Sequence, residues 1–168
     1  MDFDVVIVGG GLAGLSLAAA LRRSALSVAL LEGNAPVFPE GWDSRVYAIS
    51  PANARFLDEV GAWGHMDAAR MEPVRTMEIR GDAGGRLDFT AYGSGVSELA
   101  WILESSLMQR ELWETAKRQG NLSLLCPARP QTLAVGPEAA QLTLEDGRRL
   151  SARLVVAATG RGRRDEWQ

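Results

Sequence analysis

A glycine-rich turn near the N-terminus constrains the fold of this chain more than any other feature. The turn is Gly9-Gly10-Gly11, and Gly14 follows in the next stretch. Residues 4–8 before it form a β-branched run typical of a strand buried on both faces, and residues 12–23 after it carry apolar side chains at helical spacing. Residues 27–32 then have the pattern of a second buried strand. This order predicts a βαβ unit and hence a Rossmann-like α/β fold.

The glycine spacing is that of a dinucleotide-binding turn. Gly9 permits the tight turn out of the strand, and Gly11 lets a pyrophosphate approach the backbone. Gly14 lets the helix pack closely on the sheet. Leu12 and Ala13 stand at the helix N-terminus, where N–H groups and the positive end of the helix dipole favour phosphate. The turn therefore predicts a binding site for ADP.

Glu32 ends the second strand of this unit. A carboxylate at that position can accept hydrogen bonds from the ribose hydroxyls of adenosine. It is followed by Gly33-Asn34 and not by an arginine, which argues against the 2′-phosphate of NADP. The motif leaves open whether the ADP belongs to NAD or to FAD.

The rest of the chain predicts a mixed set of elements. Ser50 and Pro51 predict the N-cap and first turn of a helix that runs to about Val60, after an irregular stretch at residues 33–43. Residues 76–90 predict an antiparallel hairpin with one solvent-exposed face. Further strands are expected at residues 99–103, 122–126, 131–135, 141–145 and 154–158, the last of them buried, and a helix at 105–119 with Leu107, Met108, Leu112 and Trp113 inside.

Composition argues against several other classes. The net charge of −3 gives no electrostatic reason to expect nucleic acid. Cys126 is the only cysteine and His65 the only histidine, so we expect no internal disulfide, no metal site and no Ser-His-Asp triad. Cys126 is expected to be a buried structural thiol. The N-terminus lacks a basic signal-peptide region, and glycines interrupt its apolar run too early for a transmembrane segment, which predicts a cytoplasmic protein.

Residues 42–50, Trp-Asp-Ser-Arg-Val-Tyr-Ala-Ile-Ser, resemble the segment after the second strand in the flavin-dependent aromatic hydroxylases of ubiquinone biosynthesis. Those enzymes are p-hydroxybenzoate hydroxylase-like flavoprotein monooxygenases. Later segments, residues 76–90, 98–104 and 109–113, resemble the same family in the same order. The resemblance covers about residues 4–160. It implies that residues 1–168 are an FAD-binding domain, with about 73–103 as an insertion that contributes to a substrate-side sheet.

The resemblance also implies a site and a reaction. By position, Arg45 would contact FAD near the pyrophosphate, and Glu104, Gln109 and Gly160 would lie beside the cofactor. NAD(P)H would reduce FAD, and one oxygen atom of O₂ would pass to the ring of a polyprenylphenol. The flavin performs the difficult chemistry, so no catalytic side chain is expected. The family's role allows association with a biosynthetic complex or with the periphery of the inner membrane.

The chain departs from the family pattern in three places. Ser105-Ser106 stand where Glu104 is usually followed by Asn-Arg, and Thr159 replaces the Asp of an Asp-Gly pair. The family's later Gly-Asp segment and most of its substrate sheet are missing from the 168 residues, and residues 161–168 are expected to be a disordered tail. We therefore expect a partial domain that is inactive alone. Two other hypotheses stay open: a stand-alone NAD- or FAD-binding module, and a non-catalytic interaction protein with a degenerate cofactor site.

Overall fold

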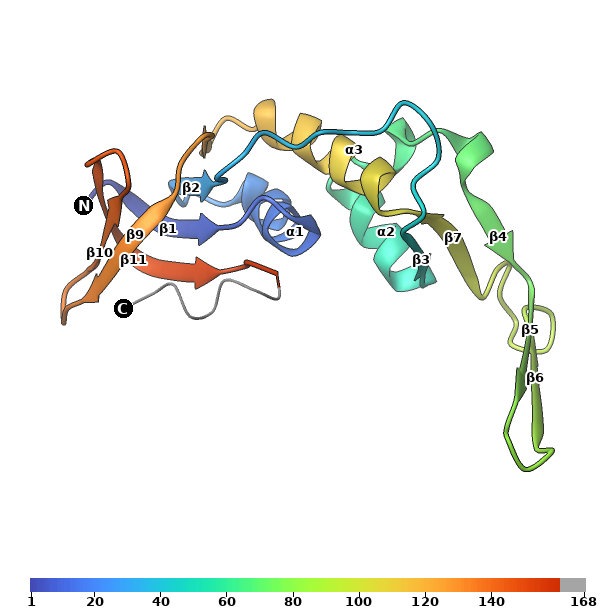
Figure 1. Ribbon diagram of the computed structural model, residues 1–168. Coiled ribbons are helices and arrows are strands. Elements are labelled where there is room, and N and C mark those ends of the chain that lie inside the picture. The colour runs from blue at the N-terminus through green and yellow to red at the C-terminus, as the bar shows by residue number, and fades with distance from the viewer. Residues whose placement is uncertain (161–168) are drawn as a thin grey trace. The chain divides into compact units, whose positions relative to one another are not determined.

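The computed structural model describes residues 1–160 and divides into two compact units (Figure 1). Unit 1 contains Met1–Phe38 and the chain from Gln109 onwards, and unit 2 contains Pro39–Met108. The expected tail at 161–168 lies outside the described residues. Each unit is described by itself.

Unit 1 is built on a six-stranded sheet with the order β8-β2-β1-β11-β10-β9. The bounds of its strands are β1 Phe3–Val8, β2 Val28–Leu31, β8 Leu122–Leu125, β9 Pro130–Val135, β10 Ala140–Leu144 and β11 Arg149–Ala157. β1 pairs in parallel with β2 and β11, and β2 pairs in parallel with β8. β9, β10 and β11 form an antiparallel meander. The helices are α1 (Leu12–Ala20), extended by a 3₁₀ turn η1 (Leu21–Arg23), and α3 (Ser105–Lys117), which contains the boundary between the units.

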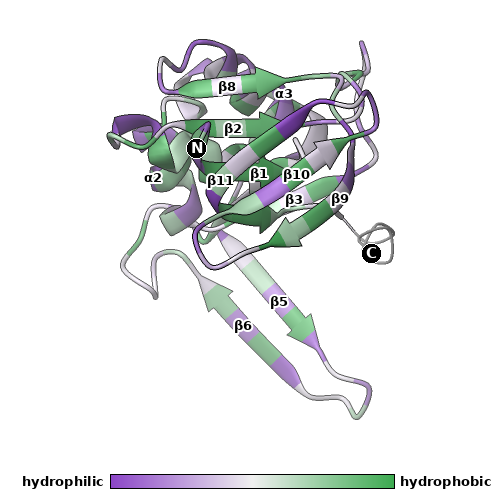
Figure 2. Cartoon of the chain, turned by 90° about the vertical axis from the view of Figure 1, so that its left-hand side faces the viewer, coloured by the Kyte–Doolittle hydropathy of each residue, from purple (hydrophilic) through white to green (hydrophobic). Residues whose placement is uncertain are grey.

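The predicted βαβ unit is confirmed as β1, α1 and β2, and it holds the core of unit 1. Ile7 and Leu30 on the strands and Leu15 on α1 are fully buried. Each of these side chains contributes about 1.5–3 kcal/mol by leaving water. Figure 2 shows β2 apolar along its whole length, as expected of a strand covered on both faces. The fold class expected from the sequence is therefore correct.

The last strand differs from its prediction in length and in burial. β11 begins at Arg149, and Ala152 is its only buried residue. Leu154 is 53% exposed although it belongs to the apolar run that predicted a buried strand. Within residues 1–160 the main contacts of β11 are with its neighbours β1 and β10 and not with a helix. An apolar run is buried only where a second layer covers it, so the prediction of a buried strand was wrong here.

Unit 2 contains a three-stranded antiparallel sheet and a capped helix. The sheet order is β3-β7-β4, with β3 at Val46–Ile49, β7 at Ala100–Glu104 and β4 at Glu72–Val74. The helices are α2 (Pro51–Glu59) and the 3₁₀ turns η2 (Trp63–His65) and η3 (Ala68–Arg70). The predicted cap of α2 is confirmed, since the Asn53 N–H donates to Ser50 Oγ at 3.3 Å and Gly61 follows with φ +77°. The sequence did not predict β3 or β4.

The predicted hairpin is formed by β5 (Thr76–Arg80) and β6 (Arg86–Thr90), but its expected burial is wrong. Met77 pairs with Phe89 and Ile79 with Leu87, so these four apolar side chains share one face. Figure 2 shows the alternation of apolar and polar residues along both strands. All ten strand residues are exposed, because the hairpin is a two-stranded ribbon with no second layer over it among residues 1–160.

Two smaller expectations concern Cys126 and the membrane. Cys126 is half-buried and not fully buried as expected, because it follows the last residue of the edge strand β8. Burial and the negative charge of Glu32 raise the pKa of its thiol, which favours the inert protonated form. No helix within residues 1–160 has the length and apolar character needed to cross a bilayer.

Candidate nucleotide-binding site

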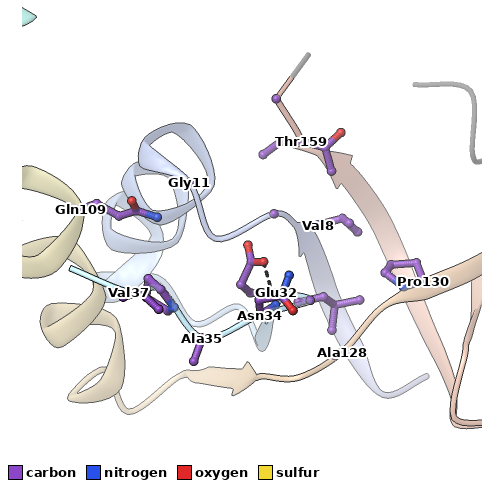
Figure 3. A pocket seen from close by; sticks show the side chains of 16 residues that line it. Val8, Gly11, Glu32, Asn34, Ala35, Val37, Gln109, Ala128, Pro130 and Thr159 are labelled. Atoms are coloured by element: carbon purple, nitrogen blue, oxygen red, sulfur yellow. Dashed lines mark hydrogen bonds between the residues drawn. The ribbon is translucent and has the colours of Figure 1, made fainter. Parts of the chain in front are cut away.

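A cavity of about 620 Å³ lies where the parallel strands of unit 1 end (Figure 3). Ligands of open α/β sheets bind at this carboxyl edge. Five segments contribute to the walls: the turn after β1, the chain after β2, the start of the unit 1 part of α3, the residues at the start of β9 and just before it, and the residues after β11. The lining residues are Val8, Gly9, Gly11, Leu31, Glu32, Gly33, Asn34, Ala35, Pro36, Val37, Gln109, Ala128, Pro130, Ala158, Thr159 and Gly160.

Gly9 and Gly11 in the turn and Gly14 in α1 serve different purposes. Gly9 has φ +112°, and a Cβ there would lie 2.8 Å from the Ala158 carbonyl oxygen. A Cβ on Gly14 would lie 1.9 Å from the Gly9 carbonyl oxygen, so the start of α1 touches the turn directly. A Cβ on Gly11 would meet nothing within 4 Å. Gly9 and Gly14 are therefore required by packing, whereas Gly11 faces space that a ligand can enter.

The N-terminus of α1 opens beside Gly11. The helix begins at Leu12 with Gly11 as N-cap, and its first turn has neither a capping side chain nor an acidic residue. The first N–H groups of a helix have no intrahelical acceptor, and Leu12 and Ala13 carry such groups. They create a region of positive potential that favours a phosphate.

Glu32 joins the turn to the chain after β2. Its Oε2 accepts from the Gly10 N–H at 2.7 Å. Its Oε1 accepts from the Asn34 N–H at 3.1 Å, and Figure 3 shows Glu32 beside Asn34 in the cavity. The side chain is half-buried and lines the cavity. Each carboxylate oxygen keeps a further lone pair, so Glu32 can accept from sugar hydroxyls while it holds the backbone.

Sequence analysis missed a second wall of the cavity, which comes from residues 128–130. The Ala128 N–H donates to the Glu32 carbonyl oxygen at 2.8 Å. Arg129 donates to the Gly33 carbonyl oxygen at 3.3 Å and to Asn34 Oδ1 at 2.6 Å. No arginine stands next to Glu32 in the sequence, but the fold brings the distant Arg129 to the same turn. No local pattern could have shown this, because the contact depends on the pairing of β2 with β8.

The structure brings most of the predicted site residues to one place. Gln109 lines the cavity, and its Nε2 donates to the Gly10 carbonyl oxygen at 3.0 Å, which fixes the turn. Gly160 lines the cavity next to Thr159. Arg45 belongs to unit 2, where it is exposed.

Glu104, expected near the cofactor, is a buried member of an ion pair in unit 2. Its side chain is 1% exposed. Arg70 Nε donates to Glu104 Oε1 at 2.7 Å, and Arg70 Nη2 donates to Oε2. This pairing, together with the bond from the Asp43 N–H, holds the pKa of Glu104 below its ordinary value, although burial and the negative charge of Asp43 act in the opposite direction.

The lowered pKa of Glu104 predicts a pH dependence of folding. A group whose folded pKa is depressed contributes stability above its unfolded pKa, about 4.3 for Glu, and loses it as the pH falls through the folded value. We expect the free energy of unfolding to decrease on acidification below that pH, and to decrease less in Glu104→Gln. Urea unfolding of both proteins between neutral and acid pH measures the difference. An identical pH slope in the two proteins would contradict the assignment.

Comparison with known proteins agrees with the geometry. The family model described as lycopene cyclase protein matches residues 4–167. The chain belongs to this family. Curated relatives include the mitochondrial ubiquinone biosynthesis monooxygenase COQ6 of Drosophila melanogaster, 34% identical, and the ubiquinone hydroxylase UbiL of Rhodospirillum rubrum, 35% identical. Each match covers 94% of this chain, which spans 36% and 37% of the length of these two relatives.

A solved structure supports the same relationship. PqsL of Pseudomonas aeruginosa, a probable FAD-dependent monooxygenase, is 25% identical with a TM-score of 0.74, over 96% of this chain and 44% of that chain. The resemblance to the ubiquinone-biosynthesis hydroxylases is thus confirmed, and FAD is the cofactor that this family of monooxygenases implies.

Proposed function

We propose that the cavity of unit 1 binds the ADP part of FAD. The observation that carries the proposal is the open space at Gly11, which lies between the N-terminus of α1 and the Glu32 carboxylate. N–H donors and a positive dipole end suit the pyrophosphate, and a carboxylate acceptor suits the ribose. The residues present therefore fit the cofactor that the family implies.

Each side of the cavity has a separate task in this proposal. The backbone of Gly11, Leu12 and Ala13 holds the pyrophosphate, and Glu32 orients the ribose. Gln109 keeps the glycine turn in place through its bond to the Gly10 carbonyl oxygen. When bound, FAD supplies the redox chemistry that the side chains of this chain cannot supply.

The proposed activity is that of the ubiquinone-biosynthesis hydroxylases. The chain would supply the FAD-binding part of an NAD(P)H- and O₂-dependent hydroxylase that acts on a polyprenylphenol in ubiquinone biosynthesis. Names of relatives such as the 3-demethoxyubiquinol 3-hydroxylase of Escherichia coli support this substrate class. Oxygen uptake with NAD(P)H and a polyprenylphenol analogue tests the expectation that the chain is inactive alone, with hydrogen peroxide and hydroxylated product both quantified. Any NAD(P)H oxidation should release hydrogen peroxide without product, and stoichiometric hydroxylated product would contradict that expectation.

For unit 2 we propose that residues 73–103 form the insertion on the substrate side and that Arg45 binds the pyrophosphate. The apolar face of the hairpin, formed by Met77, Ile79, Leu87 and Phe89, suits contact with a prenylated ring or with a partner in a biosynthetic complex at the inner membrane. Co-sedimentation with anionic lipid vesicles tests the membrane association, and a protein that stays in the supernatant at low salt would contradict it.

The binding experiment separates FAD from the other hypotheses. The purified chain is titrated with FAD, NAD and ADP, and its thermal midpoint is followed, because a ligand of the native state raises that midpoint. FAD should stabilise the protein and ADP should compete with it. Stabilisation by NAD but not FAD would favour a stand-alone NAD module, and no shift with any of them would favour an interaction protein.

Glu32→Ala is expected to weaken ADP binding by about 1–3 kcal/mol, the cost of losing hydrogen bonds to a charged group. Isothermal titration measures the change, and Glu32→Gln, which keeps one acceptor, should lose less. If the unmodified protein bound NADP better than NAD, the role of this carboxylate would be refuted.

A further inference from the structure

The ion pair between the half-buried Arg70 and the buried Glu104 has no task in the proposed binding of FAD. Removing two charges from water is costly, and apolar side chains of similar size in place of an ion pair often stabilise a protein equally. A buried pair is therefore weak evidence for stability, and its hydrogen bonds to other groups are more informative. Here the side-chain bonds of the pair to other groups lead to Gly41 and Asp43.

The pair holds the start of this segment. The Asp43 N–H donates to Glu104 Oε2, and Arg70 Nη2 donates to the Gly41 carbonyl oxygen at 2.9 Å. The Arg70 guanidinium also lies 5.1 Å from the centre of the Trp42 ring, within the range of a cation–π contact. Three consecutive residues are thus fixed by one ion pair.

Asp43 in turn holds the backbone of Arg45. Its Oδ1 accepts from the Arg45 N–H at 3.0 Å, and its Oδ2 accepts from the Ser106 N–H at 3.1 Å. The Arg45 carbonyl oxygen accepts from the Ser105 N–H at 2.8 Å. Both polar groups of the Arg45 backbone are therefore held, and the two serines that depart from the family pattern provide the required bonds through their main chain.

The side chain of Arg45 is left available. It is exposed, and none of the ion pairs within residues 1–160 involves it. A guanidinium on a fixed backbone loses less entropy when it binds an anion than one on a mobile loop.

We propose that Arg70 and Glu104 are positioning residues that fix the backbone of residues 41–45 and so present Arg45 to an anionic group of the ligand. The identity of that group, a phosphate of FAD, rests on the proposed function. The pair touches neither cofactor nor substrate in this proposal and acts only through Asp43 and Arg45.

A double-mutant cycle on FAD affinity tests the proposal. Arg45→Ala should weaken FAD binding at least about tenfold, the loss of one charge-assisted hydrogen bond. Arg70→Lys keeps the charge but loses the bidentate fork, and it should weaken binding by several-fold. The double variant should bind no worse than Arg45→Ala alone, because Arg70 acts through Arg45. The matched control is Arg153→Lys, which changes an exposed pair with Asp4 in unit 1 and should leave the affinity unchanged.

A purely structural role would give a different pattern. Additive losses in the double variant, or an unchanged affinity in Arg70→Lys, would overturn the proposal. Should Arg70→Lys fail to fold, the pair is replaced by Arg70→Met with Glu104→Leu, which removes both charges and keeps the space filled. That variant should fold and still lose FAD affinity; full affinity would overturn the proposal.

The two proposals fail in different ways. If FAD binds and Gly11→Val abolishes that binding while Arg45→Ala has no effect, the positioning proposal is wrong and the cofactor site stands. If the unmodified chain binds no FAD, both are overturned.

Discussion

Gly11→Val is expected to abolish binding of FAD and ADP while the protein stays folded. The new Cβ would meet no protein atom within 4 Å, and Gly11 has a negative φ that valine can adopt, so the folded state can accept the side chain. The branched carbons would occupy the space proposed for the pyrophosphate. Titration with FAD and ADP measures the loss, and circular dichroism shows whether the fold persists. An unchanged affinity would remove Gly11 from the site.

Gly14→Ala, in contrast, should lower the free energy of unfolding. Its Cβ would lie 1.9 Å from the Gly9 carbonyl oxygen, and this contact is with backbone, so no flexible side chain can move away. Either α1 or the turn must shift, at a cost above about 3 kcal/mol, the upper end of ordinary overpacking. Urea unfolding gives the free-energy difference. The control is Gly64→Ala, because a Cβ at Gly64 meets nothing within 4 Å. A Gly14→Ala protein as stable as this control would contradict the close contact.

The two glycine variants separate the two demands on one turn. Gly11→Val should lose ligand binding but keep its stability, whereas Gly14→Ala should lose stability. This result would show that one glycine leaves space for the ligand and the other allows close packing of the backbone. The glycine spacing predicted this division, and the geometry supplies the distances.

Local chemistry made the βαβ unit predictable. The apolar run before Gly9, the glycine turn and the helical spacing after it each agree with the observed elements, and Ser50 with Pro51 predicted the start of α2. In these segments neighbouring residues decide the structure. The edge strand β3 could not be predicted in this way, because its residues are mostly exposed and pair with β7, which is distant in the sequence.

The candidate site was predictable only where it is local. Gly11, Glu32 and Gln109 line one cavity as expected, whereas Ala128 and Pro130 reach it through the sheet order. Glu104 pairs with Arg70, and no local pattern identifies this partner, which a buried carboxylate needs.

The proposed position of the ADP part can be measured directly by nuclear magnetic resonance. Backbone amide signals of the isotope-labelled chain are recorded while FAD is added, and the experiment is repeated with ADP. Both ligands should shift the amide signals of Gly11, Leu12, Ala13 and Asn34. In the Gly11→Val protein, neither ligand should shift the signals of this region. Amide signals of the glycine turn that stay unchanged at saturating FAD would contradict the account.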